Sequence, residues 1–290
     1  MNTATLRRLA LWFFFLLAPA AGWSQAPAAG QLGSAAALQA RFKEVQPQLE
    51  KNPFGRPLVL ASTEASGQLS GNIFAVVDHP FAQVSAALAQ PAVWCQVLML
   101  HLNTKNCAVQ GSGAATMLAV AVGRKFDQPL SETQRLNFVW KPVTQSADYM
   151  SARLSADEGP LSTRDYRIEF EATPIAGDKT FIHLAYAYAY GTAARLAMQG
   201  YLATLGSDKV GFSSDGSQLV GGVRGVVERN TMRYYLAIDS YLDFPAAGQL
   251  DQRLASWFDA TERYARQLHE ISREDYLAMK HNEYKEMASR

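Results

Sequence analysis

The hydrophobic pattern is organised around one stretch near the carboxyl end, Val220 to Asp243. Apolar residues recur there at steps of three and four positions, which places them on one stripe of a helix. The stripe consists of Val223, Val226, Val227, Tyr234, Ile238 and Tyr241. Arg224, Glu228 and Asp239 fall on the other side. We therefore predict one long helix, over which the rest of the domain closes.

Upstream of this helix the pattern changes to a period of two, which is typical of β-strands. The predicted strands are Leu58 to Leu60, Leu69 to Asp78, Met117 to Lys125, Arg135 to Lys141, Tyr149 to Leu154, Thr163 to Thr173 and Lys179 to Gly191. The last five follow one another with short turns, so we expect an antiparallel meander. Between Asp165 and Ala172, charged residues that include Glu169 and Glu171 alternate with apolar ones. The sheet should therefore have one wet face and one buried face.

The last strand, Phe181 to Gly191, departs from this alternation because neither of its faces carries a charge. One face consists of Ile182, Leu184, Tyr186, Tyr188 and Tyr190, and the other consists mainly of alanines. The small face would let a helix approach closely, while the tyrosines line a cavity or the outer surface. Alternatively, the tyrosines simply suit a strand and point their hydroxyls to solvent. The sequence leaves both interpretations open.

Helical periods and end signals mark several shorter helices. Asp78, His79 and Pro80 end the second strand and start a helix, and another helix follows Pro91. Ser272 opens a capping box for the last helix, whose remainder is charged and is expected to fray. The other predicted helical segments are Ala35 to Phe42, Ala193 to Leu205 and Leu250 to Ile271.

The amino terminus has the pattern of a secretory signal peptide. Arg7 and Arg8 precede an apolar run from Leu9 to Ala18, and small residues follow as far as Ala26. The run is shorter than the roughly 20 residues that span a bilayer, so cleavage is favoured over a membrane anchor. The expected organisation is a signal peptide at 1–26, a linker or packing arm at 27–55, a domain at 56–245 and a helical extension at 246–290. The mature protein would then be periplasmic or otherwise secreted.

Cys95 and Cys107 are the only cysteines in the chain. In an oxidising compartment, a close pair usually forms a disulfide, which for so short a loop contributes about 3 kcal/mol in the chain-entropy model. Free buried thiols are the alternative. A metal site would need more ligands, and His101, between the two cysteines, lacks the usual ligand spacing. We therefore predict a disulfide and no metal site.

Charge and motif content exclude several classes of function. Lys and Arg number 27 against 26 Asp and Glu, and cleavage would remove two arginines, so the mature chain is near neutral. A nucleic-acid partner would normally need a basic face, and none is visible. The sequence contains no nucleophile elbow, Walker loop or dinucleotide fingerprint, so we predict neither catalytic residues nor a cofactor. His79, His101 and His183 could act as acids or bases, but lone histidines in such positions are more often structural.

From about Leu58 to Asp243 the predicted elements occur in a definite order. One or two strands come first, followed by a pair of helices, a run of antiparallel strands and then a long helix. Together with the Val77-Asp78-His79-Pro80 junction and the Gly-Val-Val-Glu-Arg-Asn stretch at 225–230, this order resembles the START-like superfamily, also called SRPBCC. The resemblance implies an α+β helix-grip fold, in which a curved antiparallel sheet wraps around the long helix, here with additional C-terminal helices. Members typically hold a hydrophobic ligand between sheet and helix, and many transfer lipids. This chain departs from that pattern in its C-terminal helices, its cysteine pair and the bridge at 193–217.

The main hypothesis is an exported protein that holds a hydrophobic small molecule or lipid between the sheet and the long helix, with transient membrane contact as a further expectation. The candidate ligand-binding residues are Ile168, Phe170, Tyr186, Tyr188, Asn230, Arg233, Tyr234 and Ile238, and Ala193 to Leu205 is a candidate lid. If Asn230 or Arg233 points toward the sheet, it could bind a ligand headgroup or a strand carboxylate. A structural ion pair with Glu228 or Asp239, or plain exposure to solvent, is the favoured alternative. Two alternatives stay open. The first is a filled scaffold of the cell envelope that binds a protein partner through its terminal helices, and the second, with less support, is a cyclase-type or hydrolase-type enzyme.

Overall fold

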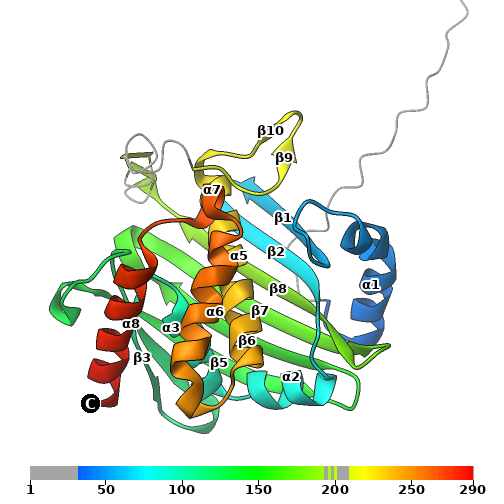
Figure 1. The fold of residues 1–290 in the computed structure, drawn as a ribbon, viewed down its shortest axis with the longest axis horizontal. Helices are drawn as coiled ribbons and strands as arrows, with labels where there is room; N and C mark the ends of the chain where they lie inside the picture. Colours follow the sequence, from blue (N-terminus) through cyan, green and yellow to red (C-terminus); the bar gives the residue numbers. More distant parts are fainter. Residues whose placement is uncertain (1–31, 193–194, 197–198, 201–208, 290) are drawn as a thin grey trace, which may run out of the picture.

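The computed structural model describes residues 32–192, 195–196, 199–200 and 209–289. Helices lie on both faces of one large sheet, and the elements are numbered as in Figure 1. The expected signal peptide lies outside the described residues, as does most of the candidate lid, Ala193 to Leu205.

Eight antiparallel strands form the sheet, in the order β1-β2-β8-β7-β6-β5-β4-β3. Their bounds are β1 Leu58–Ala65, β2 Gln68–Val77, β3 Thr104–Gln110, β4 Met117–Val122, β5 Gln134–Gln145, β6 Met150–Glu158, β7 Thr163–Ile175 and β8 Lys179–Tyr190. Each strand from β4 to β8 pairs with the next, so the predicted meander is confirmed. The sequence analysis missed β3, which begins with the polar run Thr-Lys-Asn and depends on its pairing with β4. A small hairpin, β9 Ser214–Asp215 and β10 Gln218–Leu219, precedes the long helix.

The long helix is α5, Gly222–Asp243, and it lies against the inner face of the sheet (Figure 1). The tyrosine face of β8 is the side that faces this helix, and its alanine face points outward. The helix approaches most closely not at those alanines but at Gly71 of β2. A Cβ atom at Gly71 would lie 2.2 Å from Oγ1 of Thr231, so only glycine leaves room for the helix there.

The polar side of α5 is covered rather than solvated. Glu228 is fully buried, and its carboxylate accepts hydrogen bonds from the Ser62 hydroxyl at 2.5 Å and from the backbone N–H of Ser213 at 2.9 Å. Asp239 forms an ion pair with Arg56 at 2.6 Å. Because the buried carboxylate has several donors, β1 and the segment before β9 can close over this side of the helix.

Two short helices, α2 Phe81–Leu88 and α3 Pro91–Leu100, connect β2 to β3. The predicted disulfide is present: Cys95 of α3 is bonded to Cys107 of β3, with 5.3 Å between their Cα atoms. In the part of the chain that the structure describes, no single helix is long and apolar enough to cross a bilayer; α2 and α3, bent by 92°, reach that length and composition only as a pair.

Three helices follow α5: α6 Leu250–Glu262, α7 Ala265–Leu268 and α8 Arg273–Ala288. Ser272 caps α8 as predicted, since its hydroxyl oxygen accepts a hydrogen bond from the backbone N–H of Asp275 at 3.1 Å. The expectation that α8 frays is wrong. Its Tyr276 side chain is buried, stacks on Trp257 and donates to the backbone oxygen of Leu100 at 3.0 Å.

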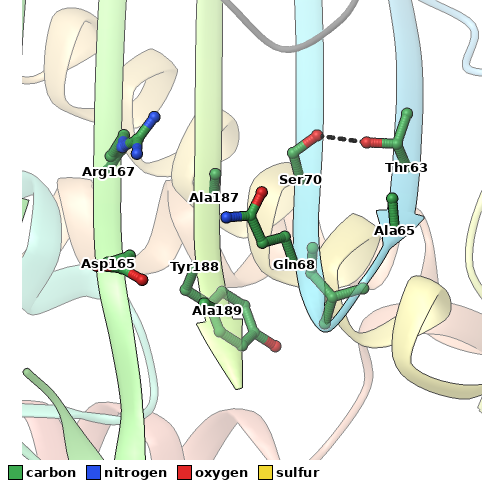
Figure 2. Close-up of a pocket in the computed structure, with 10 residues that line it drawn as sticks. Thr63, Ala65, Gln68, Ser70, Asp165, Arg167, Ala187, Tyr188 and Ala189 are labelled. Atoms are coloured by element: carbon green, nitrogen blue, oxygen red, sulfur yellow. Dashed lines mark hydrogen bonds between the residues drawn. The ribbon is translucent and has the colours of Figure 1, made fainter. Parts of the chain in front are cut away.

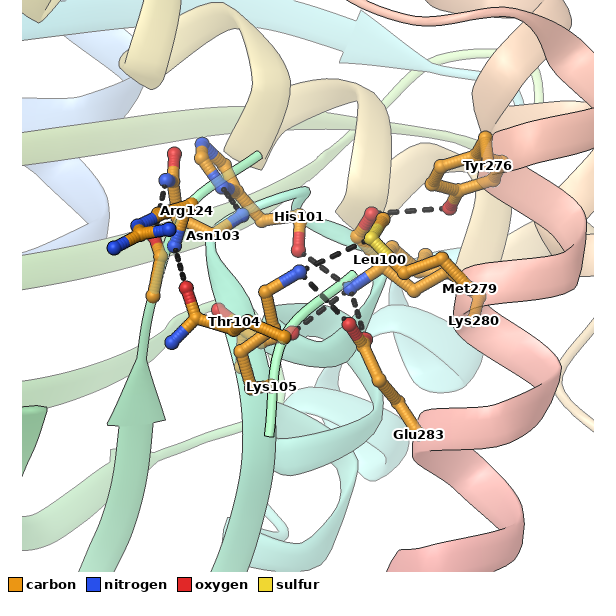
Figure 3. A network of polar contacts seen from close by, with 12 residues as sticks. Leu100, His101, Asn103, Thr104, Lys105, Arg124, Tyr276, Met279, Lys280 and Glu283 are labelled. Carbon is orange, nitrogen blue, oxygen red and sulfur yellow. Dashed lines mark hydrogen bonds and ion pairs between the residues drawn. The ribbon is translucent and has the colours of Figure 1, made fainter. Parts of the chain in front are cut away.

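A buried cluster of charges also fixes α8 to the domain (Figure 3). Lys280 donates to the backbone oxygens of His101 and Thr104, both at 2.8 Å, and to Glu283 at 2.7 Å. Lys105 of β3 pairs with the same carboxylate at 2.9 Å. The charged residues of α8 are thus partly internal, and their pattern in sequence does not distinguish this arrangement from a solvated helix.

The amino-terminal arm packs against the outer face of the sheet through α1, Ala35–Glu50, which is longer than the predicted segment Ala35 to Phe42. The helix covers Glu171, so the expected wet face is wrong at this position. The Glu171 carboxylate accepts hydrogen bonds from Tyr149 at 2.6 Å, from His183 at 2.9 Å and from the backbone N–H groups of Leu32 and Gly33 at 3.0 and 2.8 Å. Taken together, the elements confirm the predicted α+β helix-grip class with additional C-terminal helices.

Candidate functional site

Four tyrosines gather where the inner face of the sheet meets α5. Tyr166 of β7 stacks on Tyr188 of β8, with 5.3 Å between ring centroids, and Tyr188 lies 5.5 Å from Tyr186. Tyr186 in turn meets Tyr234 of α5 edge to face at 5.2 Å. The alternation in β8 places its two tyrosines on one face, and the register of β7 against β8 brings Tyr166 beside them. We call these four residues the tyrosine cluster.

The aliphatic part of the predicted wall belongs to the filled core. Ile168, Phe170 and Ile238 are fully buried, and Phe170 packs edge to face on Trp94 with 6.0 Å between ring centroids. These side chains belong to the same hydrophobic core as Tyr166, Tyr186 and Tyr188.

Val223, Asn230 and Tyr234 lie on one side of α5 and remain partly exposed, as do Arg224, Val226 and Asp239. Their spacing of seven and four positions places them on one helical stripe. Along most of the remaining helix, the side chains are buried. Neither Tyr186 nor Tyr234 has a hydroxyl hydrogen bond to any residue within the described ranges. The stripe and the tyrosine cluster therefore form an aromatic surface with open hydroxyl groups.

His101, directly after α3, lies at one end of this surface, with its ring centroid 5.1 Å from that of Tyr234. Its Nδ1 atom accepts a hydrogen bond from the backbone N–H of Asn103 at 3.1 Å. Burial and the nearby Arg233, Lys280 and Lys125 hold the pKa of His101 well below its usual value. The ring is therefore neutral, and since Nδ1 is an acceptor, its single proton is on Nε2.

Asn230 and Arg233 complete this polar end, and they have different roles. Arg233 is buried and forms an ion pair with Glu270 at 2.8 Å, rather than with either acid of its own helix, and also donates to the backbone oxygen of Leu268 at 3.1 Å. A further N–H of Arg233 donates to Oδ1 of Asn230 at 3.4 Å. Arg233 thus positions Asn230, while Asn230 keeps part of its own surface open.

Electrostatics at this end of the site favour neutral tyrosines and ionised acids. Burial raises the pKa of both Tyr186 and Tyr234, so their hydroxyls remain protonated and can donate hydrogen bonds. Burial opposes ionisation of Glu270, but Arg233 and Lys125 hold its pKa below the usual value. Lys125 pairs with the same carboxylate at 2.7 Å.

A hollow of about 280 Å³ lies on the outer face of the sheet beside the β1–β2 turn (Figure 2). Its lining includes Gln68, Arg167 and Ala187. The buried polar residue in it, Ser70, is already hydrogen-bonded to Thr63 at 2.9 Å. This hollow has a polar rim over a floor of small side chains, and Tyr188 of the tyrosine cluster also contributes to its lining.

The remaining histidines do not form a catalytic arrangement with this site. His183 is buried between Glu171 and Asn72, each at 2.9 Å, which confirms the structural role favoured by the sequence. His79 lies beside Asp243 at the other end of α5, 3.1 Å away. Across the described ranges, no three His, Cys, Asp or Glu side chains are grouped as metal ligands. Tyr166 and His101 were missing from the predicted site, although the apolar alternation of β7 already placed Tyr166 on its buried face.

Comparisons with known proteins reach only the level of the fold. No protein-family model matches the chain, and no curated protein matches it. Similar solved structures include human StAR-related lipid transfer protein 5, with 10% identity, coverage of 72% of this chain and 96% of that chain, and a TM-score of 0.37. Ara h 8.0201 has 12% identity, coverage of 61% and 98%, and a TM-score of 0.37. A norcoclaurine synthase point mutant from Thalictrum flavum has 14% identity, coverage of 51% and 92%, and a TM-score of 0.35.

These identities and TM-scores carry no functional assignment, and the assignment of the fold depends on the strand order and on the placement of α5. An antiparallel sheet with one long helix against its inner face, preceded by two short helices between β2 and β3, is the arrangement expected from the sequence. The chain therefore has the α+β helix-grip fold that the sequence predicted.

Proposed function

We propose that this protein binds an apolar small molecule or lipid between the inner face of the sheet and α5, against the tyrosine cluster. Apolar and aromatic surface would supply the affinity, and a few polar groups would set the orientation of the ligand. Val223 and Tyr234 provide apolar contact area, and the hydroxyls of Tyr186 and Tyr234 are the nearest polar groups with open valences.

The observation that carries this proposal is the partial exposure of Tyr234, within the tyrosine cluster, on a helix most of whose residues are buried. Tyr234 packs against Tyr186 and His101 and is desolvated strongly enough to raise its pKa, yet part of its surface remains accessible. An aromatic side chain that is strongly desolvated and still partly accessible is expected beside an enclosed space. A fully packed interface would bury the ring, as it buries Ile238 one turn later.

Binding of a neutral apolar dye, N-phenylnaphthylamine, tests the location directly, because its fluorescence rises in an apolar environment. Val223→Trp places a bulky ring on the exposed stripe and should weaken dye binding by about tenfold or more, as expected when a well-packed site is overfilled. Ala187→Leu is the matched control, since it fills the hollow on the outer face. Dye affinity that falls only in Ala187→Leu would place the ligand on the outer face and contradict the proposal.

A filled scaffold that binds a protein partner is the second candidate. The complete burial of Ile168, Phe170 and Ile238 favours it, since this part of the predicted wall has no open surface. Mass spectrometry of the gently purified protein separates the two functions: a co-purifying apolar molecule supports binding, and a wild-type protein that takes up neither lipid nor dye supports the scaffold. Deletion of α8 does not distinguish them, because Tyr276 and Lys280 are part of the core.

Export is part of the same proposal. The signal-peptide pattern at 1–26 and a disulfide between Cys95 and Cys107 both support an oxidising compartment outside the cytoplasm. The intact mass of the protein recovered from a secreting host checks it. Loss of the first 26 or so residues is expected, and retention of the full chain in the cytoplasm would contradict export.

A further inference from the structure

The side-chain amide of Asn230 has a definite orientation because its neighbours are both hydrogen-bond donors. The Arg233 guanidinium donates to Oδ1 of Asn230 at 3.4 Å. His101 carries its proton on Nε2, and Asn230 lies close enough to act on its pKa, although Nε2 makes no hydrogen bond to any residue within the described ranges. An amide nitrogen facing two donors would be repelled, so the oxygen of Asn230 must face them.

This orientation leaves the amide nitrogen of Asn230 as the group that faces the exposed stripe. Asn230 precedes Tyr234 by one helical turn, so the two side chains are neighbours on the same face of α5. Both residues are partly exposed, and the hydrogen bond from Arg233 engages the oxygen of Asn230 rather than its nitrogen. Asn230 and Tyr234 therefore both carry hydrogen-bond donors on a partly exposed side of α5.

The charges around this point are mainly cationic. Arg233, Lys280 and Lys125 each lower the pKa of His101, which shows that the potential at the imidazole is positive. The nearby carboxylates are each shared by two cations, with Glu270 between Arg233 and Lys125 and Glu283 between Lys105 and Lys280. A positive potential favours an oxygen with negative charge and disfavours an ammonium group.

We infer that the polar end of the bound molecule is a hydrogen-bond acceptor, a carboxylate or carbonyl oxygen, held by the amide nitrogen of Asn230. This inference rests on the proposed function, and it adds the chemical class of the ligand: an apolar chain or ring system that ends in an acid or a carbonyl group, not in an amine. Arg233 acts as a positioning residue, because its hydrogen bond holds the oxygen of Asn230 and thereby aims its nitrogen.

Three twelve-carbon molecules that differ only in their end group test the inference: dodecanoate, dodecanol and dodecylamine. Each competes with N-phenylnaphthylamine for the full-length mature protein at neutral pH. Wild type should bind dodecanoate about tenfold or more tightly than dodecylamine, because a hydrogen bond to a charged group discriminates by roughly that factor. Dodecanol measures the contribution of the apolar chain.

The matched substitutions are Asn230→Asp and, on the exposed side of α8, Asn282→Asp. Asn230→Asp keeps an oxygen toward Arg233 and His101 but replaces both N–H donors with a negative charge. It should weaken dodecanoate binding about tenfold or more and invert the order of acid and amine, with dodecanol nearly unchanged. Asn282→Asp should keep the wild-type order. Asn230→Leu, which adds no charge, should remove the preference without inverting it, and thermal denaturation of each variant checks that it is folded.

The outcomes separate the inference from the proposed function. If wild type binds dodecanol and the dye but shows no preference for the acid over the amine, the inference fails and apolar binding stands. If Asn230→Asp and Asn230→Leu both fold and keep the wild-type preference, Asn230 does not hold the end group and the inference fails as well. If wild type binds none of the probes, both proposals fail.

Discussion

Glu283 provides a quantitative test of how the carboxyl-terminal helix is attached to the domain. Its carboxylate is the only acid within hydrogen-bond distance of Lys105 and Lys280 among the described residues, and both lysines are almost completely buried (Figure 3). Glu283→Gln preserves the shape of the side chain but leaves two buried cations without a counter-charge. Breaking one side of a buried ion pair costs about 3 to 5 kcal/mol, a large part of the total stability of most domains.

The pH dependence follows from Lys280. Burial lowers the pKa of Lys280 from 10.5 to about 8, with Glu283 opposing the shift. The folded state therefore releases this proton at lower pH than the unfolded state does, and between about pH 8 and 10.5 the unfolded state binds more protons. Stability should rise with pH across that window by about 3 kcal/mol, since each pKa unit corresponds to roughly 1.4 kcal/mol. Glu283 raises the pKa of Lys280, so in Glu283→Gln this pKa lies below that of wild type. The deficit relative to wild type should therefore narrow as the pH rises toward 8 and stay constant above it, where Lys280 is neutral in both folded proteins.

Urea denaturation followed by circular dichroism, with the disulfide intact, measures both effects. Glu286→Gln is the matched control, because it removes the same charge from an exposed position of α8 and should change the free energy of unfolding by less than about 0.5 kcal/mol. A Glu283→Gln protein within about 1 kcal/mol of wild type at neutral pH would refute the reasoning. A deficit that does not narrow between about pH 6 and 8 would refute the assignment of the pH dependence to Lys280.

Two further predictions concern other buried contacts. Glu171→Gln should destabilise the protein by about 1 to 3 kcal/mol at neutral pH, because an amide nitrogen would replace a carboxylate oxygen that accepts hydrogen bonds from buried donors. Hydrogen bonds from His183 and Tyr149, acting against burial, lower the pKa of Glu171, so its contribution in wild type is present above the ordinary pKa of 4.5 and is lost as the pH falls through the lower folded value. Denaturation at pH 7 and in mild acid checks this, and equal stabilities of wild type and variant at pH 7 would contradict it. Gly71→Ala should cost about 2 kcal/mol or more, because the new Cβ would lie 2.2 Å from Thr231 Oγ1, and Thr231→Ala should restore part of the loss. A double mutant with merely additive losses would mean that Thr231 is not the obstacle.

Several elements could be predicted because their signals are local. The strands β2 and β5 to β8 and the helix α5 each bury a face set by side chains two, three or four positions apart, so the period of the sequence identifies them. The disulfide followed from a close cysteine pair in an exported chain. In contrast, β3 lacks a strong alternation and depends on pairing with β4, which no local pattern specifies.

The candidate site was only partly predictable. Tyr186, Tyr188 and Tyr234 were expected from their stripes, and the structure brings them together. Ile168, Phe170 and Ile238 were expected as an open wall but are buried, because a stripe predicts which face is covered and not how completely it is filled. His101 could not be placed, since it comes from the turn after α3, far in sequence from its neighbour on α5.

Charged residues illustrate the same limit. Glu171 alternates with apolar neighbours as a solvated residue would, and Glu228 lies on the polar side of α5, yet both are fully buried. The alternation is identical whether water or another element covers that face. The amino-terminal arm with α1, more than a hundred residues earlier in the chain, covers Glu171. The segment before β9 covers Glu228, so burial of both acids depends on distant parts of the chain.

By itself, the sequence determined the α+β class, the long helix, the meander, the disulfide and the tyrosine stripe, because each depends on the spacing of neighbouring residues along the chain. The tertiary structure decided which face of β8 meets α5, which acids are buried, that α8 is part of the core and that Asn230 meets His101. Those facts depend on contacts between distant segments, and the free energy of such contacts comes from surfaces that exist only once the chain has folded.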